Sequence, residues 1–377
     1  MPDYVKHLRL AASSAVTRAL RHGNAKPIGY IGWTGHSNLG DEALYEAIKK
    51  LLRPTPLAEY SAAREKLLAK VNLSGPKYFQ GVLLGGGTLI SPGFLRPVER
   101  ALQQKLPMIS FGTGAGSSGF GDVISPRLEP WQRPLQAFEM VGVRGPRSFD
   151  VLSRMGVRTV EVIGDPALTL GPGSLPPLRE RPTLALNVAK DSDSSYGSGN
   201  SVCYRELANI ARDHVRRGGD VIPVAFGNGD VEIIQECLTD AGLPHIPIHR
   251  PKTTAEFFDL VSGTHVLLGV RLHSVVLGSV VGAVPVMVAY RDKCWDFTES
   301  LGLQDLTVNF QETAGPVIRD AYERAFDEAA QRRNVMFAQV QHWRQKQIEF
   351  ASRVLTVFTG REVGSEAQNS ASAVLGD

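Results

Sequence analysis

Two residues that suit anion chemistry stand two positions apart in an otherwise apolar run, "GVRLHSVVLG", residues 269–278. Arg271 offers a fork of charged donors, and His273 titrates near neutral pH. Burying a charge without a partner costs several kcal/mol. The pattern changes from strand to helix here, which predicts that both residues lie at a helix N-terminus, where free N–H groups attract anions. An arginine there opposes the helix dipole unless something negative joins it, so the run predicts an anion site.

Other polar residues follow predicted strands and belong to the same edge. Arg144 follows a strand in "VGVRGPRS", and Lys293 follows a strand in "AYRDKCW". Asp41 and Glu42 stand at the start of the first predicted helix, in "SNLGDEAL". Ligands of open α/β sheets bind beyond the carboxyl ends of the strands, so we expect these side chains to converge. The loop contacts expected around them are Asn38, Gly86, Gly87, Gly114, Asp165 and Ser274. The glycines lie in "GGGT" (85–88) and "GTGAGSSG" (112–119), interpreted as loops that approach a ligand closely.

Each of these features also has a purely structural interpretation. The two acidic residues of "SNLGDEAL" favour any helix start. Asp165 in "GDPAL" can cap a turn, and Arg144 can be a surface charge. Arg271 with His273 can be a buried, satisfied pair. The conjunction of all of them is a stronger signal than any one.

The elements that must position these residues alternate between strand and helix patterns. The strands are predicted in "PIGYIGW", "GVLLGGG", "PMISFGTG", "MVGVRG", "VEVIGD", "TLALNVA", "DVIPVAF", "HVLLGV" and "VPVMVAY". The helices are predicted in "DEALYEAIKKLL", "RSFDVLSRMG", "VCYRELANIARDHVRRGG", "DVEIIQECLTDAG" and "TTAEFFDLVSG". Apolar strands that alternate with helices indicate an α/β fold with doubly wound, parallel sheets.

The chain is expected to form two Rossmann-like domains that face a cleft, as in GT-B proteins. The break lies in "GPGSLPPLRERP", residues 171–182, which is dense in glycine and proline. We expect an N-terminal amphipathic helix over residues 1–26, a first domain over 27–172 and a second domain over 173–314. A C-terminal helix over 315–358 can return to the first domain, and a disordered tail follows over 359–377.

Bulk composition excludes several classes of protein. Hydrophobic residues make up 43% and charged residues 21% of the chain, which is ordinary for a globular protein. The net charge of +3 is too weak to argue for nucleic-acid binding, and no nucleic-acid partner is expected. Three scattered cysteines form no metal motif or disulfide framework, which favours the cytoplasm. No metal site is expected, and no membrane-spanning segment is found, but the basic N-terminal helix can contact a membrane surface.

Together these motifs resemble the polysaccharide pyruvyl transferase family over residues 27–300. The resemblance rests on "SNLGDEAL", "LLGGGTLI", "GTGAG", "VRGPRSFDVLSRMGV", "VIGDPAL" and above all "GVRLHSVVLGSVVGAVPVMVAYRDKCWDF". The chain departs from the family at Arg291-Asp292-Lys293, where many relatives have Asp-Pro-Lys.

The resemblance implies a GT-B-like fold and an enzyme that transfers a pyruvyl group from phosphoenolpyruvate to two hydroxyls of a sugar. The product is a pyruvate ketal on a cell-surface polysaccharide or glycolipid precursor, and phosphate is released. The family's donor-binding groups fall on Arg144, Arg271, His273 and Lys293, in the second domain and at the edge of the first, with the acceptor on the first-domain side. Phosphoenolpyruvate is a co-substrate, and no cofactor is implied. The glycan acceptor can be lipid-linked, and neither its identity nor the oligomeric state follows from the sequence.

The chemistry of this reaction assigns further roles. A general acid must protonate the methylene carbon, and a base must accept a hydroxyl proton. His273 is the first candidate for one of these roles, and Asp41 or Glu42 for the other.

Three rival functions stay open. The first is a GT-B glycosyltransferase that uses a nucleotide sugar, for which Glu256 and Asp259 are the acidic candidates to hold the ribose. The second is a non-catalytic partner in polysaccharide assembly. The third is a module that binds sugar phosphates without turnover.

Overall fold

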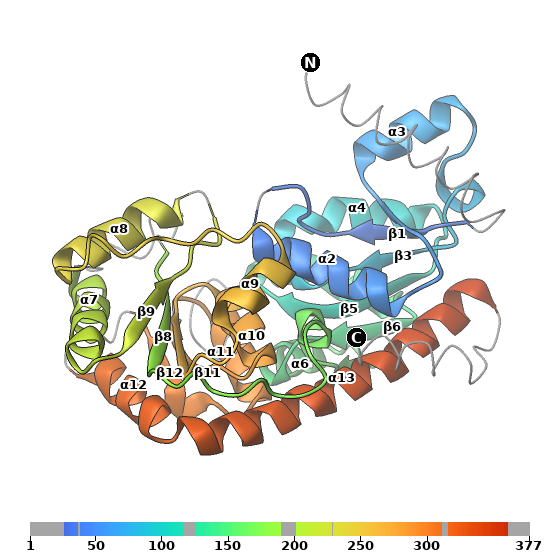
Figure 1. The fold of residues 1–377 in the computed structure, drawn as a ribbon. Helices are drawn as coiled ribbons and strands as arrows, with labels where there is room; N and C mark the ends of the chain where they lie inside the picture. Colours follow the sequence, from blue (N-terminus) through green and yellow to red (C-terminus); the bar gives the residue numbers. More distant parts are fainter. Residues whose placement is uncertain are drawn as a thin grey trace.

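The computed structural model describes residues 26–36, 38–116, 125–189, 201–227, 229–310 and 316–360. Two parallel sheets stand side by side, each covered by helices (Figure 1). The expected N-terminal helix lies outside the described residues, apart from Lys26, and so does the expected tail beyond residue 360. No helix in the described part of the chain is long and apolar enough to cross a membrane.

The first sheet has seven strands in the order β2-β1-β3-β5-β6-β7, with β4 paired to β5. The strands are β1 (Ile28–Ile31), β2 (Leu57–Glu59), β3 (Gly81–Leu84), β4 (Gly87–Ile90), β5 (Met108–Ala115), β6 (Met140–Val143) and β7 (Val160–Val162). All pairings are parallel. The central strands β1 and β3 are buried along their whole length, as expected of a sheet covered on both faces.

The second sheet has five strands in the order β12-β11-β10-β8-β9, again all parallel. The strands are β8 (Thr183–Asn187), β9 (Asp220–Pro223), β10 (Val266–Gly269), β11 (Val284–Ala289) and β12 (Thr307–Asn309). The carboxyl ends of β10 and β11 lead directly into the two segments that carry Arg271 and Lys293.

Helices connect the strands and cover both faces of the sheets. Those of the first half are α2 (Leu39–Leu51), α3 (Ala62–Lys70), α4 (Pro92–Gln103), α5 (Gln132–Gln136) and α6 (Pro146–Arg154), with a 3₁₀ turn η3 (Pro166–Thr169). Those of the second half are α7 (Ser201–Arg216), α8 (Asp230–Asp240), α9 (Thr254–Val261), α10 (Leu272–Val280), α11 (Asp292–Ser300), α12 (Val317–Asp327) and α13 (Ala329–Thr359).

The predicted α/β fold with parallel sheets is confirmed, and all nine predicted strands are present. Sequence patterns missed three strands of three or four residues, β2, β4 and β12, although the equally short β1, β3 and β7 were predicted. The interpretation of "GTGAG" as a loop was wrong for residues 112–115, which are the end of β5. The predicted C-terminal helix over 315–358 is two helices, α12 and α13, separated at Glu328.

The long helix α13 packs against both halves of the chain (Figure 1). Its first part contacts α10 and β11 of the second half. Its last part reaches the first sheet, where Phe350 meets Phe111 edge-on at 5.1 Å between ring centroids. In between, the buried guanidinium of Arg344 donates to the carbonyl oxygens of Leu168, Leu170 and Pro172. The helix therefore braces the segment in which the chain crosses from one sheet to the other.

A buried carboxylate joins the two halves at α6 and α11. Asp296 of α11 accepts hydrogen bonds from the backbone N–H and hydroxyl of Ser148 and from Arg144. The Asp296 carboxylate thus lies against the N-terminal turn of α6, where a negative charge is favourable. A Cβ on Gly145 would lie 2.0 Å from the Asp296 carbonyl oxygen, so only glycine allows this approach. The first-half strand end that carries Arg144 is thereby fixed to the second half.

Candidate active site between the two sheets

Arg271 occupies the N-cap position of α10, immediately after β10, as predicted. Its backbone N–H donates to the side chain of Asn187, and its guanidinium forms a bidentate ion pair with Asp230, with 2.7 Å from Nε to Oδ2 and 2.5 Å from Nη2 to Oδ1. The fully buried Asp230 carboxylate also accepts from the N–H groups of Phe226 and Gly227.

Asp230 thus supplies part of the negative charge that the sequence predicted beside Arg271. The Arg271 side chain stays 29% exposed, and its Nη1 has no hydrogen bond within the described residues. A second anion can therefore bind the outer edge of a guanidinium that Asp230 holds in place.

His273 is the second residue of the same helix and faces the first half of the chain. Its Nε2 is 3.8 Å from Oδ2 of Asp165, which is too long for a hydrogen bond. Both atoms are buried, and neither has a hydrogen-bond partner in the described part of the chain. The other oxygen of Asp165 accepts from the N–H of Ala167 and caps η3. A Cβ on Gly40 would lie 2.3 Å from Nδ1 of His273, so α2 closes over the imidazole.

Burial decides the protonation of this pair. Burial and the positive charges of Arg144 and Lys293 lower the pKa of His273 to about 3. Burial raises the pKa of Asp165 to about 6, although Arg144 opposes the shift. His273 is therefore neutral near pH 7, and Asp165 takes up a proton as the pH falls toward 6. Unpaired buried polar atoms are costly and rare in proteins, so this facing pair is a candidate for chemistry.

Asp41 brings a further carboxyl to the same place from the start of α2. Burial raises the pKa of Asp41 to about 6, and the nearby charges of Lys293 and Arg271 partly oppose the shift. The ammonium group of Lys293 lies 4.8 Å from the ring centroid of Tyr290 and forms no ion pair within the described residues. Asp41 follows Gly40, whose backbone lies against His273, so α2 brings Asp41 near the charges of Lys293 and Arg271.

Arg144 completes the cationic set from the carboxyl end of β6. The side chain is almost completely buried, and one nitrogen, Nη2, lies 3.2 Å from the Asp296 carboxylate. The other two nitrogens, Nε and Nη1, have no hydrogen-bond partner among the described residues. A Cβ on Gly114 would lie 2.5 Å from Nη2, so that glycine makes room for the guanidinium.

The other predicted contacts have local structural roles. Asn38 caps α2 by accepting from the N–H of Gly40, and the Ser274 hydroxyl donates to the Arg271 carbonyl oxygen. A Cβ on Gly86 would lie 2.7 Å from Leu44, so the close approach there is to the protein core. Gly87 has φ of 97°, a value that favours glycine. Roles in ligand contact for Asn38, Gly86, Gly87, Gly114 and Ser274 stay predictions.

Glu42, the alternative acidic candidate, points elsewhere. Its Oε1 accepts from the N–H of Gly35 at 2.6 Å, and the side chain lines a cavity of the first half. Asp41 is the one of the two that shares the charges of Lys293 and Arg271.

Sequence reasoning missed three residues that organise the site: Asp230, Asp296 and Gly40. A weak signal existed for Asp230, which begins a predicted helix in "GNGDVEII". Asp296 and Gly40 matter because of contacts with residues far away in the sequence, which no local pattern reveals. Among the described residues, no group of three His, Cys, Asp or Glu side chains is arranged to hold a metal ion.

The site thus joins three cationic side chains, a neutral imidazole and two carboxyls of raised pKa at one junction. Three cations suit a small ligand with several negative charges. The imidazole and the carboxyls can exchange protons near neutral pH.

Comparison with known proteins identifies a matching family. The polysaccharide pyruvyl transferase family matches residues 38–292, which is more than half of the chain. This range contains every predicted site residue except Lys293, which follows its last residue directly. None of the curated proteins compared with the chain matches it.

Solved structures share the fold at low identity. A UDP-glucosyltransferase from Polygonum tinctorium is 13% identical, with a TM-score of 0.56 over 90% of this chain and 100% of that one. MnaA of S. aureus, solved with UDP, is 12% identical, with a TM-score of 0.57 over 89% of this chain and 97% of that one. Anabaena Alr3699/HepE, solved with UDP and glucose, is 12% identical, with a TM-score of 0.50 over 89% of this chain and 100% of that one. These matches confirm the predicted GT-B-like fold and carry no further argument at such identities.

Proposed function

The chain belongs to the polysaccharide pyruvyl transferase family, and from that premise we propose that it transfers a pyruvyl group from phosphoenolpyruvate to two hydroxyls of a sugar, forming a ketal and releasing phosphate. The observation that carries the proposal is that Arg144, Arg271 and Lys293 follow the carboxyl ends of β6, β10 and β11, and that the charges of Arg144 and Lys293 act on the buried His273.

Phosphoenolpyruvate carries a carboxylate and a phosphate, and the three cations match that charge. Arg271 is held by Asp230 and offers its outer edge, so it binds without a loss of side-chain freedom. Lys293 has no competing carboxylate partner within the described residues and supplies a point charge for the phosphate. Arg144 has two unpartnered nitrogens that the donor's carboxylate satisfies when the buried site opens to admit it.

The donor also prepares His273 for proton transfer. Burial and the cations Arg144 and Lys293 keep the imidazole neutral. An anion bound between them cancels the effect of those cations and raises the pKa of His273, since an opposite charge favours the imidazolium. His273 then accepts the proton of the attacking sugar hydroxyl.

A carboxyl supplies the proton for the methylene carbon of the donor. Asp41 and Asp165 both have a pKa raised to about 6, so each holds a proton in a useful fraction of molecules near that pH. Asp41 faces Lys293 and Arg271, and we assign it the role of general acid. Protonation of the methylene carbon makes C2 electrophilic, and one hydroxyl attacks C2 and gives its proton to His273. The C–O bond to phosphate then breaks, a neighbouring hydroxyl attacks C2 and closes the ketal, and the proton of that hydroxyl leaves with the phosphate.

The rival function, a glycosyltransferase that uses a nucleotide sugar, lacks support at Glu256, one of the two acidic candidates to hold the ribose. Glu256 accepts from the N–H of Lys252, and its own N–H is capped by the Thr253 hydroxyl. That reciprocal arrangement starts α9 and engages the carboxylate that a ribose would need. The proposal also includes a glycan acceptor, which can be lipid-linked, and a cytoplasmic location. The three buried, free cysteines agree with a reducing compartment.

Thermal-shift titration tests the donor assignment. At 100 times its Kd, phosphoenolpyruvate stabilises the protein by about 2.7 kcal/mol, whereas UDP- and GDP-sugars do not. Arg271→Ala weakens binding at least about 30-fold, because losing a buried charged partner costs about 2–5 kcal/mol. That variant leaves Asp230 unpaired, so Lys293→Gln is measured beside it, since Lys293 has no ion pair within the described residues. Stabilisation by a nucleotide sugar alone would show that the chain is a glycosyltransferase.

Replacing Asp165 with asparagine changes how stability depends on pH. Asparagine keeps the oxygen that caps η3 and removes the carboxyl that titrates. A pKa raised in the folded state means that the wild type loses stability as the pH rises from about 4 to 6, by about 3 kcal/mol for a shift of about two units. We therefore expect Asp165→Asn to gain in Tm relative to the wild type between pH 4.5 and 7.5, as measured by calorimetry. A constant difference in Tm across this range contradicts the raised pKa.

A further inference from the structure

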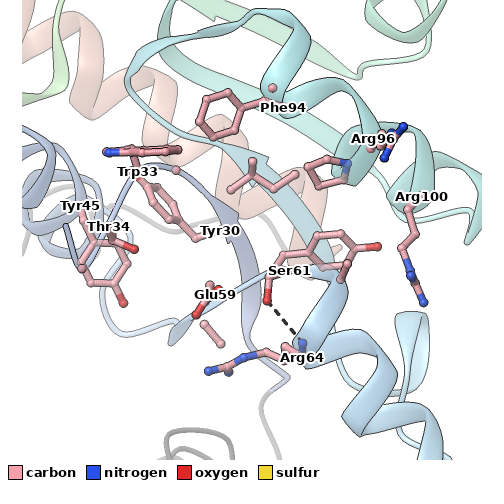
Figure 2. A pocket seen from close by; sticks show the side chains of 18 of the residues that line it. Tyr30, Trp33, Thr34, Tyr45, Glu59, Ser61, Arg64, Phe94, Arg96 and Arg100 are labelled. Carbon is pink, nitrogen blue, oxygen red and sulfur yellow. Dashed lines mark hydrogen bonds between the residues drawn. The ribbon is translucent and has the colours of Figure 1, made fainter. Parts of the chain in front are cut away.

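A cavity of about 1250 Å³ opens in the first half of the chain, beyond the carboxyl ends of β1 and β2. Helices α2, α3 and α4 form its walls (Figure 2). Its volume exceeds the 300–1,000 Å³ or so that is typical of a site for one compact small molecule. The three cations of the candidate active site do not line it.

One wall of the cavity is a rigid aromatic surface. Trp33 is 51% exposed, the largest exposed apolar side chain among the described residues. The indole stacks on His36 with ring centroids 4.2 Å apart and planes 19° apart, and it meets the edge of Phe94 at 6.1 Å. These contacts fix the ring and leave a flat apolar face in the cavity. Such a face suits the C–H face of a sugar ring, which packs well on aromatic rings.

A second wall carries two arginines without acidic partners. Arg96 and Arg100 stand four residues apart on α4 and both line the cavity (Figure 2). Like charges at this spacing destabilise a helix. Neither side chain forms a salt bridge within the part of the chain that the structure describes. A bound anion offsets their repulsion, and a phosphate accepts from both guanidinium groups.

The cavity borders the candidate active site through α2 and β1. Glu42 lines the cavity, and the preceding residue, Asp41, faces Lys293 and Arg271. Tyr30 also lines the cavity, and the charges of Asp41, Glu42 and Asp165 raise its pKa, after burial. A ligand that stacks on Trp33 therefore reaches toward the residues assigned to the donor.

We propose that this cavity binds a glycosyl phosphate, with its sugar on the indole of Trp33 and its phosphate between Arg96 and Arg100. The inference rests on the proposed function, in which this ligand is the acceptor. The sugar then lies between the donor site and the arginines, so the enzyme selects acceptors that carry a phosphate ester next to the sugar.

Intrinsic fluorescence tests the inference, because Trp33 is the most exposed indole in the described structure. The probes are the 1-phosphates of glucose, galactose, mannose and N-acetylglucosamine, the corresponding free sugars, and inorganic phosphate. We expect at least one sugar phosphate to quench the wild type and not Trp33→Phe. The double variant Arg96→Gln/Arg100→Gln raises its Kd at least about tenfold, because each charged hydrogen bond contributes about 1.5–3 kcal/mol. The matched control Arg127→Gln/Arg133→Gln removes two exposed arginines outside the cavity and leaves the Kd unchanged.

Thermal shift with phosphoenolpyruvate, measured on the same variants, separates this inference from the donor assignment. We expect phosphoenolpyruvate to stabilise all cavity variants as it stabilises the wild type. If phosphoenolpyruvate does not stabilise the wild type, the donor assignment is refuted and the cavity assignment is not. Quenching by none of the four sugar phosphates overturns the cavity assignment, as does equal binding of free sugars. We expect UDP-glucose to bind more weakly than glucose 1-phosphate, in line with the absence of stabilisation expected for UDP-sugars; tighter binding of UDP-glucose contradicts a site for a simple glycosyl phosphate.

Discussion

Replacing His273 with glutamine is expected to lower the turnover of phosphoenolpyruvate at least 100-fold, and replacing it with alanine to lower it as much. General acid–base groups supply about 10² to 10⁴ in rate. Glutamine offers a hydrogen-bond donor near the position of Nε2 but cannot accept and release a proton. If His273 only held the donor's phosphate, glutamine would restore most of the activity that alanine loses.

The measurement is acceptor-dependent release of phosphate, with the Kd of phosphoenolpyruvate followed in parallel. His273 is buried without a partner for Nε2, so neither variant leaves a charge unpaired. His245→Gln is the matched control, because that histidine is exposed and outside the site. Activity of His273→Gln within tenfold of the wild type would refute the proton-transfer role and leave a binding role.

The second large effect is on stability. Arg344→Met is expected to lower the free energy of unfolding by about 3–5 kcal/mol. The Arg344 guanidinium donates to three carbonyl groups, at 2.6 Å, 2.7 Å and 2.6 Å, in η3 and in the segment that follows it. Hydrogen bonds to a charged group contribute about 1.5–3 kcal/mol each, and methionine leaves all three carbonyls without a donor. Since η3 begins at the Asp165 cap, loosening this segment also disturbs the neighbour of His273.

Arg353→Met on the same helix is the control. Arg353 pairs with Glu161 at 2.8 Å, but both side chains are largely exposed, and such pairs contribute about 1 kcal/mol or less. The Tm of both variants is measured by calorimetry at one pH. If Arg344→Met loses no more than Arg353→Met, α13 does not brace the crossover segment.

The sequence by itself determined nine of the strands, the parallel α/β class and the position of Arg271 at the start of a helix. These features are local: each depends on the period of apolar residues or on a residue at a strand end, and both can be read within about ten positions. The family motifs belong to the same class, since they mark loops at strand ends. Short strands such as β4 escaped because their pairing partner, β5, and not their own pattern makes them strands.

Only the tertiary structure decided how the charges are paired. Asp230 is 41 positions from Arg271, and Asp296 is 152 positions from Arg144, yet they fix the two arginines. It also decided between the acid–base candidates: Glu42 accepts from the N–H of Gly35 and lines the cavity of the first half, whereas the charges of Lys293 and Arg271 act on Asp41. The facing pair of Asp165 and His273 comes from opposite halves, closed by α2. Charge, burial and proton affinity depend on what lies within a few ångströms in space, and the sequence order of distant segments does not state those distances.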